Sequence, residues 1–246
     1  MQARNSIASA VRKLTTLQRA AGKPLAIVLA GHNGSGKSTL WYDHLADELQ
    51  LPLINADRMM LSILPPPDAD DHLRPWAQQL RDEDQTWMRV AQNGVSAFIA
   101  QAMGQKAPFA VETVFSHWKE NADGTISSKL DLLRELQRAG YFVQLVFVGL
   151  STVELSMARV LTRKAQGGHD VNPVRLRQRF PRTQRAINAA LDMVDAAILV
   201  DNSRSKRTAF TPCLVRTRDT VIYDIRTSRT PVKAISNWLD IVAPQI

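Results

Sequence analysis

Along most of the chain, short runs of apolar residues alternate with longer segments in which apolar residues recur at helical spacing. The apolar runs have the length of buried strands, and they span residues 25–30, 51–57, 107–113, 141–150 and 196–203. The segments with helical spacing span residues 37–50, 82–103, 130–139, 152–165 and 173–191. Strands that alternate with helices form parallel sheets with right-handed crossovers. We therefore expect an α/β fold whose five-stranded, mostly parallel sheet has helices on both faces.

The segments before and after this alternating core have patterns of their own. Residues 1–23 predict an N-terminal helix whose apolar residues share one face: Ile7, Val11, Leu14 and Leu17. Residues 204–246 predict a β-hairpin that turns near Arg218 and Asp219, followed by a short helix. We expect residues 24–203 to form the main domain, with the last segment appended to it.

The compartment is indicated by three features of the sequence. Residues 1–42 contain no acidic residue, which is typical of mitochondrial transit peptides, but a docked helix of a cytoplasmic protein is the favoured interpretation. No apolar run approaches the roughly 18 residues of a membrane span, so we expect no membrane contact. The lone Cys213 excludes an intrachain disulfide and fits a reducing compartment.

The stretch after the first apolar run is a phosphate-binding motif that matches G-x-x-x-x-G-K-[ST] at every fixed position. Its residues, with the threonine that follows, are Gly31, His32, Asn33, Gly34, Ser35, Gly36, Lys37, Ser38 and Thr39. The glycines let backbone N–H groups approach phosphate oxygens, and the next helix adds its positive N-terminal end. Lys37 is expected to reach the β- and γ-phosphates of ATP, and the Ser38 hydroxyl is expected to bind Mg²⁺.

Two carboxylates are expected beside this loop, because ligands gather beyond the carboxyl ends of parallel strands. Asp57 ends the second apolar run, where it would accept the proton of an acceptor hydroxyl; the alternative is a cap on the following helix. Glu112 ends the third run and would hold Mg²⁺ through a water or bind the second substrate, unless it is only a solvated strand end. Thr113, the next residue, offers a hydroxyl to the same substrate.

An arginine-rich segment at residues 151–186 has the pattern of a lid over phosphates, with eight basic residues against two acidic ones. Arg159 and Arg163 are four residues apart, hence on one face of a helix. Arg179 lies on the next helical segment, beyond a Gly-Gly turn. Guanidinium groups bind phosphate oxygens bidentately, so we expect Arg163 and one of the other two at the γ-phosphate. His169, in the turn, is interpreted as structural.

The net charge of +8 is compatible with nucleic-acid binding. The basic residues do not form one tract, however, and the lid segment accounts for many of them. Nucleic acid is therefore disfavoured as the main partner, although the charge does not exclude it.

Several segments taken together resemble the zeta-toxin-like P-loop kinases. These are GHNGSGKST, NADRM, VETVFS, the RV-x₂-R that runs into GGHDV, RQRFPR and VDNS, in the family's order across residues 24–203. The resemblance implies a kinase that uses ATP and Mg²⁺ to phosphorylate a hydroxyl of UDP-N-acetylglucosamine or a related UDP-amino sugar, which poisons cell-wall synthesis. It also implies a small antitoxin protein that restrains the enzyme.

The resemblance also implies roles for individual residues. Lys37 and Ser38 would bind ATP and Mg²⁺, Asp57 would be the base, and Glu112 with Thr113 would contact the substrate. The chain departs from the family at two points: no glycine separates Glu112 from Thr113, and the hairpin tail lies outside the minimal toxin core.

We therefore expect a cytoplasmic ATP-dependent kinase that acts on a small molecule, with a nucleotide sugar as the leading acceptor. Two alternatives remain open from the sequence. One is a polynucleotide or nucleotide-cofactor kinase, and the other is a regulatory P-loop NTPase that controls a protein partner.

Overall fold

The computed structural model of the chain describes residues 6–69, 72–165 and 171–245, and its centre is a seven-stranded sheet in the order β2-β3-β1-β6-β7-β8-β9. In sheet order the strands are Leu53–Ile54, Phe109–Thr113, Leu25–Gly31, Phe142–Gly149, Ala196–Asp201, Thr211–Thr217 and Val221–Asp224. Within this sheet, β2, β3, β1, β6 and β7 pair in parallel, whereas β8 and β9 pair antiparallel. The five predicted parallel strands are all present.

The expected count of five strands is too low for the sheet as a whole. The predicted C-terminal hairpin, β8 and β9, pairs along β7 and extends the same sheet. Without the hairpin, β7 would be an exposed edge with unpaired backbone groups. A small separate sheet of β4 (Trp118–Glu120) and β5 (Ile126–Ser128) was also not predicted.

The side chains of β1 alternate between two hydrophobic clusters, one on each face of the sheet. Ala26, Val28 and Ala30 face a cluster with residues of α7 (Leu130–Arg138), α9 (Pro173–Leu191) and α10 (Lys233–Val242). Leu25, Ile27 and Leu29 face a cluster with residues of α1 (Ile7–Ala21) and the helix that follows β1. The predicted layering of helices on both faces is therefore confirmed, and the core lies on both sides of the parallel strands.

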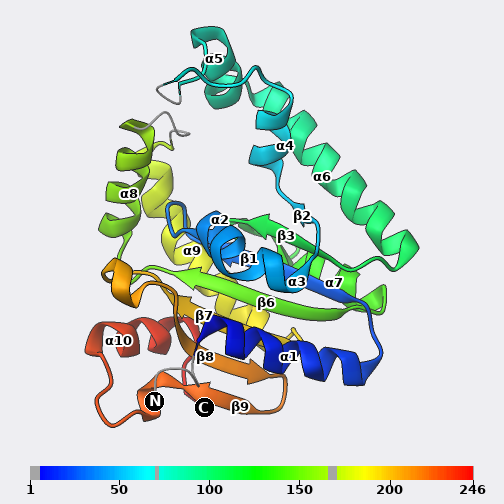
Figure 1. Cartoon of the computed structure of the whole chain (residues 1–246), viewed down its shortest axis with the longest axis vertical. Coiled ribbons are helices and arrows are strands. Elements are labelled where there is room, and N and C mark those ends of the chain that lie inside the picture. The colour runs from blue at the N-terminus through cyan, green and yellow to red at the C-terminus, as the bar shows by residue number, and fades with distance from the viewer. Residues whose placement is uncertain (1–5, 70–71, 166–170, 246) are drawn as a thin grey trace.

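The helix after β1 runs in three parts, α2 (Lys37–Leu40), a π-helical turn (Trp41–Leu45) and α3 (Ala46–Leu49). Three further helices, α4 (Ala56–Ser62), α5 (Pro75–Glu83) and α6 (Gln85–Gln105), rise above the sheet on one side in Figure 1. On the other side stands α8 (Val153–Ala165). The helical elements thus flank the part of the molecule that contains the phosphate loop.

The N-terminal helix α1 packs on β7 and β8, as a docked helix should. Ile7, Val11 and Leu14 are buried, but Leu17 is 40% exposed, so the face that these residues were expected to share is not buried as far as Leu17. At about 100° per residue, Leu17 lies about 80° around the helix from Ile7. Leu17 is therefore at the flank of the buried face.

The C-terminal helix α10 docks through Trp238 at the end of β6, where only glycine fits. A Cβ built on Gly149 would lie 1.9 Å from Trp238 Cζ2. We expect Gly149→Ala to lower the free energy of unfolding by about 1–3 kcal/mol through overpacking. The matched control is Gly104→Ala in α6, where a Cβ meets nothing within 4 Å. It should leave stability unchanged or raise it by up to about 1 kcal/mol. Urea denaturation of both variants checks this, and equal stabilities would contradict the close contact.

Candidate active site

The phosphate loop forms a tight turn between β1 and α2, in which the backbone N–H of Ser35 donates to the carbonyl of His32. Gly34 and Gly36 have φ of 69° and 88°, a left-handed backbone that side chains other than glycine disfavour. Lys37 is only 8% exposed, and its Nζ donates to the carbonyl oxygens of Gly31 (3.3 Å) and His32 (3.2 Å). The lysine therefore lies against the inside of the loop, at the N-terminus of the helix.

Two polar side chains from distant elements hold the loop from outside. Asn202, just after β7, donates its Nδ2 to the carbonyl of Ser35 at 2.8 Å. Ser156 on α8 donates its hydroxyl to the carbonyl of Asn33 at 2.7 Å. The sequence assigned no role to either residue, although Asn202 belongs to the VDNS segment. They fix the loop to the ends of the neighbouring elements.

Charges predicted from separate segments converge on Lys37. Burial lowers the pKa of Lys37, the carboxylates of Glu112 and Asp57 oppose that shift, and the Arg163 guanidinium lowers the pKa further. Of these three charges, that of Glu112 is placed beside the loop by the hydrogen bonds that its carboxylate accepts from Ser38, the residue after Lys37. The fold thus brings the carboxylate of the third predicted strand to the phosphate loop.

Glu112 is the centre of a hydrogen-bond network beside the loop. It lies in β3 opposite Leu29 of β1, and its two carboxylate oxygens accept from the Ser38 hydroxyl, each at 3.1 Å. Asn55 donates its Nδ2 to the same carboxylate at 2.7 Å. Glu112 is therefore not merely a solvated strand end, and Asn55 is a neighbour that sequence reasoning missed.

This network has the chemistry of a magnesium site. Mg²⁺ prefers oxygen ligands and is usually held by one or two carboxylates together with substrate phosphates and water. Ser38 and Glu112 supply a hydroxyl and a carboxylate that already touch each other. A hydroxyl and one carboxylate are donors of the kind that Mg²⁺ takes from a protein when nucleotide phosphates supply further ligands.

Asp57 does not end a strand, contrary to expectation. Strand β2 stops at Ile54, and Asp57 is exposed in the first turn of α4. The cap of that helix is Asn55, whose Oδ1 accepts from the backbone N–H of Arg58 at 3.2 Å. The capping role considered for Asp57 is therefore wrong, and its side chain is exposed at the start of α4.

Thr113 ends β3, but its hydroxyl has a local partner. The Thr113 Oγ1 accepts from the backbone N–H of Phe115 at 3.3 Å. Phe115 is buried with φ of 62°, an uncommon conformation for a residue other than glycine. The threonine thus braces a tight turn after the strand, and its contact with substrate stays a prediction.

The predicted lid arginines occupy three positions around the loop. Arg159 on α8 lies against Gly34, since a Cβ built on that glycine would be 3.1 Å from the Arg159 Cβ. Arg163 is one helical turn further along and is exposed. Arg179 on α9 is half-buried and lines a narrow space with Asn33 of the loop. Burial lowers the pKa of Arg159 and of Arg179. The glycine pair of the turn and His169 lie outside the described residues.

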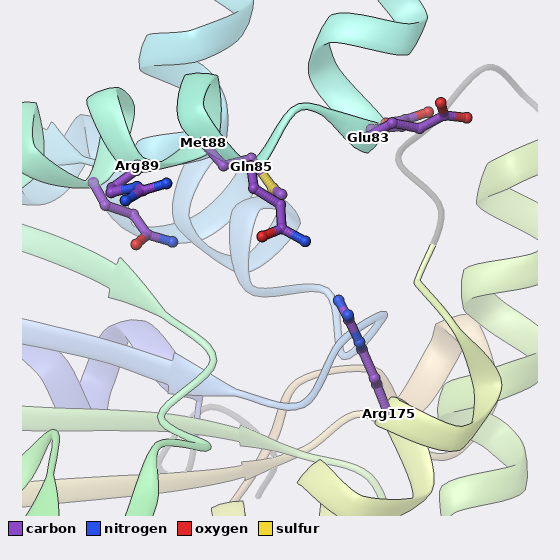
Figure 2. Close-up of a pocket in the computed structure, with 7 residues that line it drawn as sticks. Glu83, Gln85, Met88, Arg89 and Arg175 are labelled. Carbon is purple, nitrogen blue, oxygen red and sulfur yellow. The ribbon is translucent and has the colours of Figure 1, made fainter.

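A cleft of about 710 Å³ opens between α9 and the helices α5 and α6, and the sequence did not predict it. Its lining residues are Asp82, Glu83, Gln85, Met88, Arg89, Gln92 and Arg175. Figure 2 shows Arg175 pointing from the start of α9 toward Gln85 of α6. The cleft thus lies between α9, the helix that carries Arg179, and the pair of helices α5 and α6.

Comparison with known proteins identifies the family. A family model described as Zeta toxin matches residues 8–228. The chain belongs to the zeta toxin family. As a zeta toxin family member it is a phosphotransferase of the P-loop kinase type, which confirms the resemblance and the enzyme class expected from the sequence.

Solved structures share the fold of nearly the whole chain. A structure from the PezAT chromosomal toxin–antitoxin system of Streptococcus pneumoniae covers 97% of this chain and 86% of its own, with a TM-score of 0.54 and 16% identity. A crystal structure of AvrRxo1-ORF1:-ORF2 with ATP covers 96% of this chain and 72% of its own, with a TM-score of 0.57 and 13% identity. These identities are low, so the similarity shows the fold alone.

One curated relative of this zeta toxin family member is an uncharacterized protein of Haemophilus influenzae. It is 27% identical over 144 residues, which cover 58% of this chain and 84% of the relative. In the part of the chain that the structure describes, no helix is both long and apolar enough to cross a membrane.

Proposed function

We propose that this zeta toxin family member transfers the γ-phosphoryl group of ATP to a hydroxyl of a nucleotide sugar such as UDP-N-acetylglucosamine. The observation that supports this most is the contact of the Ser38 hydroxyl of the loop with the Glu112 carboxylate, next to the buried Lys37. A site that holds a basic loop, a metal-binding carboxylate and a second carboxylate has the parts that phosphoryl transfer requires.

The loop and the Glu112 network would bind the nucleotide. Residues 31–39 would surround the phosphates with backbone N–H groups, and Lys37 would turn from the loop carbonyls to the β- and γ-phosphates. Ser38 and Glu112 would hold Mg²⁺, which neutralises phosphate charge when bound. Asn55, which donates to Glu112, would orient that carboxylate.

Asp57 and the arginines would act on the transferring group. Asp57, exposed beside the loop, would accept the proton of the acceptor hydroxyl. Arg163, with Arg159 or Arg179, would stabilise the negative charge that develops on the phosphoryl oxygens. Phosphoryl transfer relies chiefly on such alignment and charge compensation, so this division of roles is sufficient.

The cleft between α6 and α9 supports an acceptor that carries phosphate of its own. Arg89 lines it from α6 and Arg175 from α9, and guanidinium groups suit a diphosphate. Two acidic residues, Asp82 and Glu83, also line the cleft, and the Asp82 carboxylate is paired with Arg81. Gln85 and Gln92 on the same lining offer amides for sugar or base groups. Thr113 and Glu112 would contact the sugar at the side of the loop. We further propose that the protein works in the cytoplasm. We also propose that it is the toxin of a toxin–antitoxin pair, which the structural similarity to the PezAT toxin–antitoxin system supports.

Labelled ATP distinguishes the candidate functions when it is incubated with defined acceptors. We expect label on UDP-N-acetylglucosamine and none on an oligonucleotide with a 5′-hydroxyl. Label on the oligonucleotide alone would favour the polynucleotide kinase, and label only in inorganic phosphate would favour a regulatory NTPase.

The role of the cleft is tested by Arg175→Gln, which should raise the KM for the acceptor more than the KM for ATP.

Arg163→Lys should lower turnover by about 10–100-fold while ADP affinity stays within a few-fold of the wild type. Lysine keeps the charge but loses the planar fork that binds two phosphoryl oxygens at once. Turnover and calorimetric ADP affinity are measured side by side. The matched control is Arg185→Lys, an exposed arginine of α9. Equally small effects in both variants would show that Arg163 is only a solvated surface residue.

A further inference from the structure

The second residue of the phosphate loop, His32, is buried in an aromatic contact with the lid helix. Its ring stacks on that of Phe180 of α9, with centroids 3.9 Å apart and planes 10° from parallel. The edge of Phe147 of β6 completes the contact, with centroids 5.5 Å apart and planes at 71°. His32 is only 2% exposed. The His32 ring therefore forms a stacked contact between the phosphate loop and α9.

Both sides of this contact continue directly into proposed catalytic groups. On the loop side, the backbone carbonyl of His32 accepts from Lys37 Nζ at 3.2 Å and from the N–H of Ser35 at 3.1 Å. On the helix side, Phe180 directly follows Arg179, and both line the narrow space that His32 also borders. A shift of α9 relative to His32 would therefore move Arg179 relative to Lys37.

We propose that His32 is a positioning residue whose ring, stacked on Phe180, holds the arginine-bearing helix α9 in register with the phosphate loop. This inference rests on the proposed function for its catalytic consequence, but the structural coupling does not depend on the identity of the acceptor. His32 acts through Lys37 and Arg179 and does not touch the transferred group.

The ring works by its shape and not by its proton. Burial, with a smaller contribution from the charge of Lys37, lowers the pKa of His32 to about 3, so the ring is neutral at physiological pH. Among the described residues, Arg179 is the charged side chain that borders the same space. The His32 Nε2 is buried without a hydrogen-bond partner in the described part of the chain. A ring without nitrogen should therefore replace it.

The C-terminal helix stabilises this arrangement from behind. Trp238 of α10 stacks on Phe147, with centroids 5.9 Å apart and planes 17° from parallel. Phe147 in turn contacts the His32 ring. The appended helix α10 thus packs against the β-strand residue on which His32 rests, although it lies beyond the residues that the family model matches.

The first test is a set of four variants: His32→Ala, His32→Phe, Phe180→Ala and the double alanine. Turnover is followed as ATP consumption, and ADP affinity is measured by calorimetry. We expect His32→Ala and Phe180→Ala each to lower turnover by about 10–100-fold, since small misplacement of a catalytic group has effects of this size. The double variant should be no worse than the worse single one, because both remove the same contact. ADP affinity should change only a few-fold, and His32→Phe should recover most of the turnover.

The matched control removes an aromatic contact of the same core that lies away from the loop. Phe109 and Tyr141 meet edge to face, with centroids 5.7 Å apart, and Phe109 begins β3 opposite Ala26, at the end of β1 that is remote from the loop. Phe109→Leu should lower thermal stability without changing turnover. Loss of turnover in Phe109→Leu equal to that in His32→Ala would mean that general weakening of the core, and not the stack, explains the effect.

The second test is independent of activity and uses amide hydrogen exchange along α9. We expect faster exchange around Phe180 in His32→Ala and wild-type exchange in His32→Phe. Unchanged exchange in His32→Ala would overturn the inference, as would additive effects of the two alanine variants. If the exchange result holds while the wild type consumes no ATP, the proposed function fails and the coupling stands.

Discussion

Asp57→Asn should lower turnover by about 10²–10⁴-fold, because the amide keeps the shape of the side chain but cannot accept the hydroxyl proton. ATP and ADP affinity should change little, since Glu112 and Ser38 are the proposed metal ligands. Steady-state turnover on the true acceptor, with calorimetric ADP affinity beside it, measures both quantities.

A control variant and a contrary outcome distinguish a proton-accepting role of Asp57 from a metal-binding role. Asp219→Asn changes an exposed aspartate in the hairpin turn and should leave both quantities unaltered. If Asp57→Asn abolished nucleotide binding but left the turnover of bound substrate intact, Asp57 would belong to the metal site and not to the acceptor.

Lys37→Ala should lower turnover by about 10²–10³-fold while the fold is retained. The lysine is buried, but its Nζ donates to two carbonyls of its own loop, so it contributes little to the core. Nucleotide affinity should also fall, because the positive charge serves the ground state as well as the transition state. Circular dichroism confirms the fold and an ATP-consumption assay measures turnover. Lys13→Ala, at an exposed position of α1, is the control. Unchanged turnover in a folded Lys37→Ala protein would refute the assignment of the loop.

The parts of this site that are local in sequence could be predicted, and the long-range contacts could not. The loop of residues 31–38 joins the end of a strand to the start of a helix through a glycine-rich turn. Each of these three features is determined by neighbouring residues in the sequence. The contacts of Asn55 with Glu112 and of Asn202 with Ser35 bridge 57 and 167 residues. Each is one amide side chain without a spacing pattern. Only the three-dimensional fold shows that these residues meet the site.

The corrections have equally physical causes. Asp57 was expected at a strand end because the apolar run reaches that far, but Asn55 caps α4 and ends the strand earlier. The sheet has more than the five expected strands because the predicted hairpin pairs with β7. Arg89 and Arg175 line the same cleft from two different helices, and no local sequence pattern indicates that they lie near each other. The stack of His32 on Phe180 joins the loop to the lid in the same way.

The fate of the γ-phosphate in a metabolite extract tests the central claim most directly. The protein is incubated with a small-molecule extract and ATP that carries a heavy-oxygen label in its γ-phosphate, and the products are read by mass spectrometry. The account predicts a labelled phosphate ester on a nucleotide sugar for the wild type and none for Lys37→Ala. Label found only in inorganic phosphate, or transfer that persists in folded Lys37→Ala protein, would contradict it.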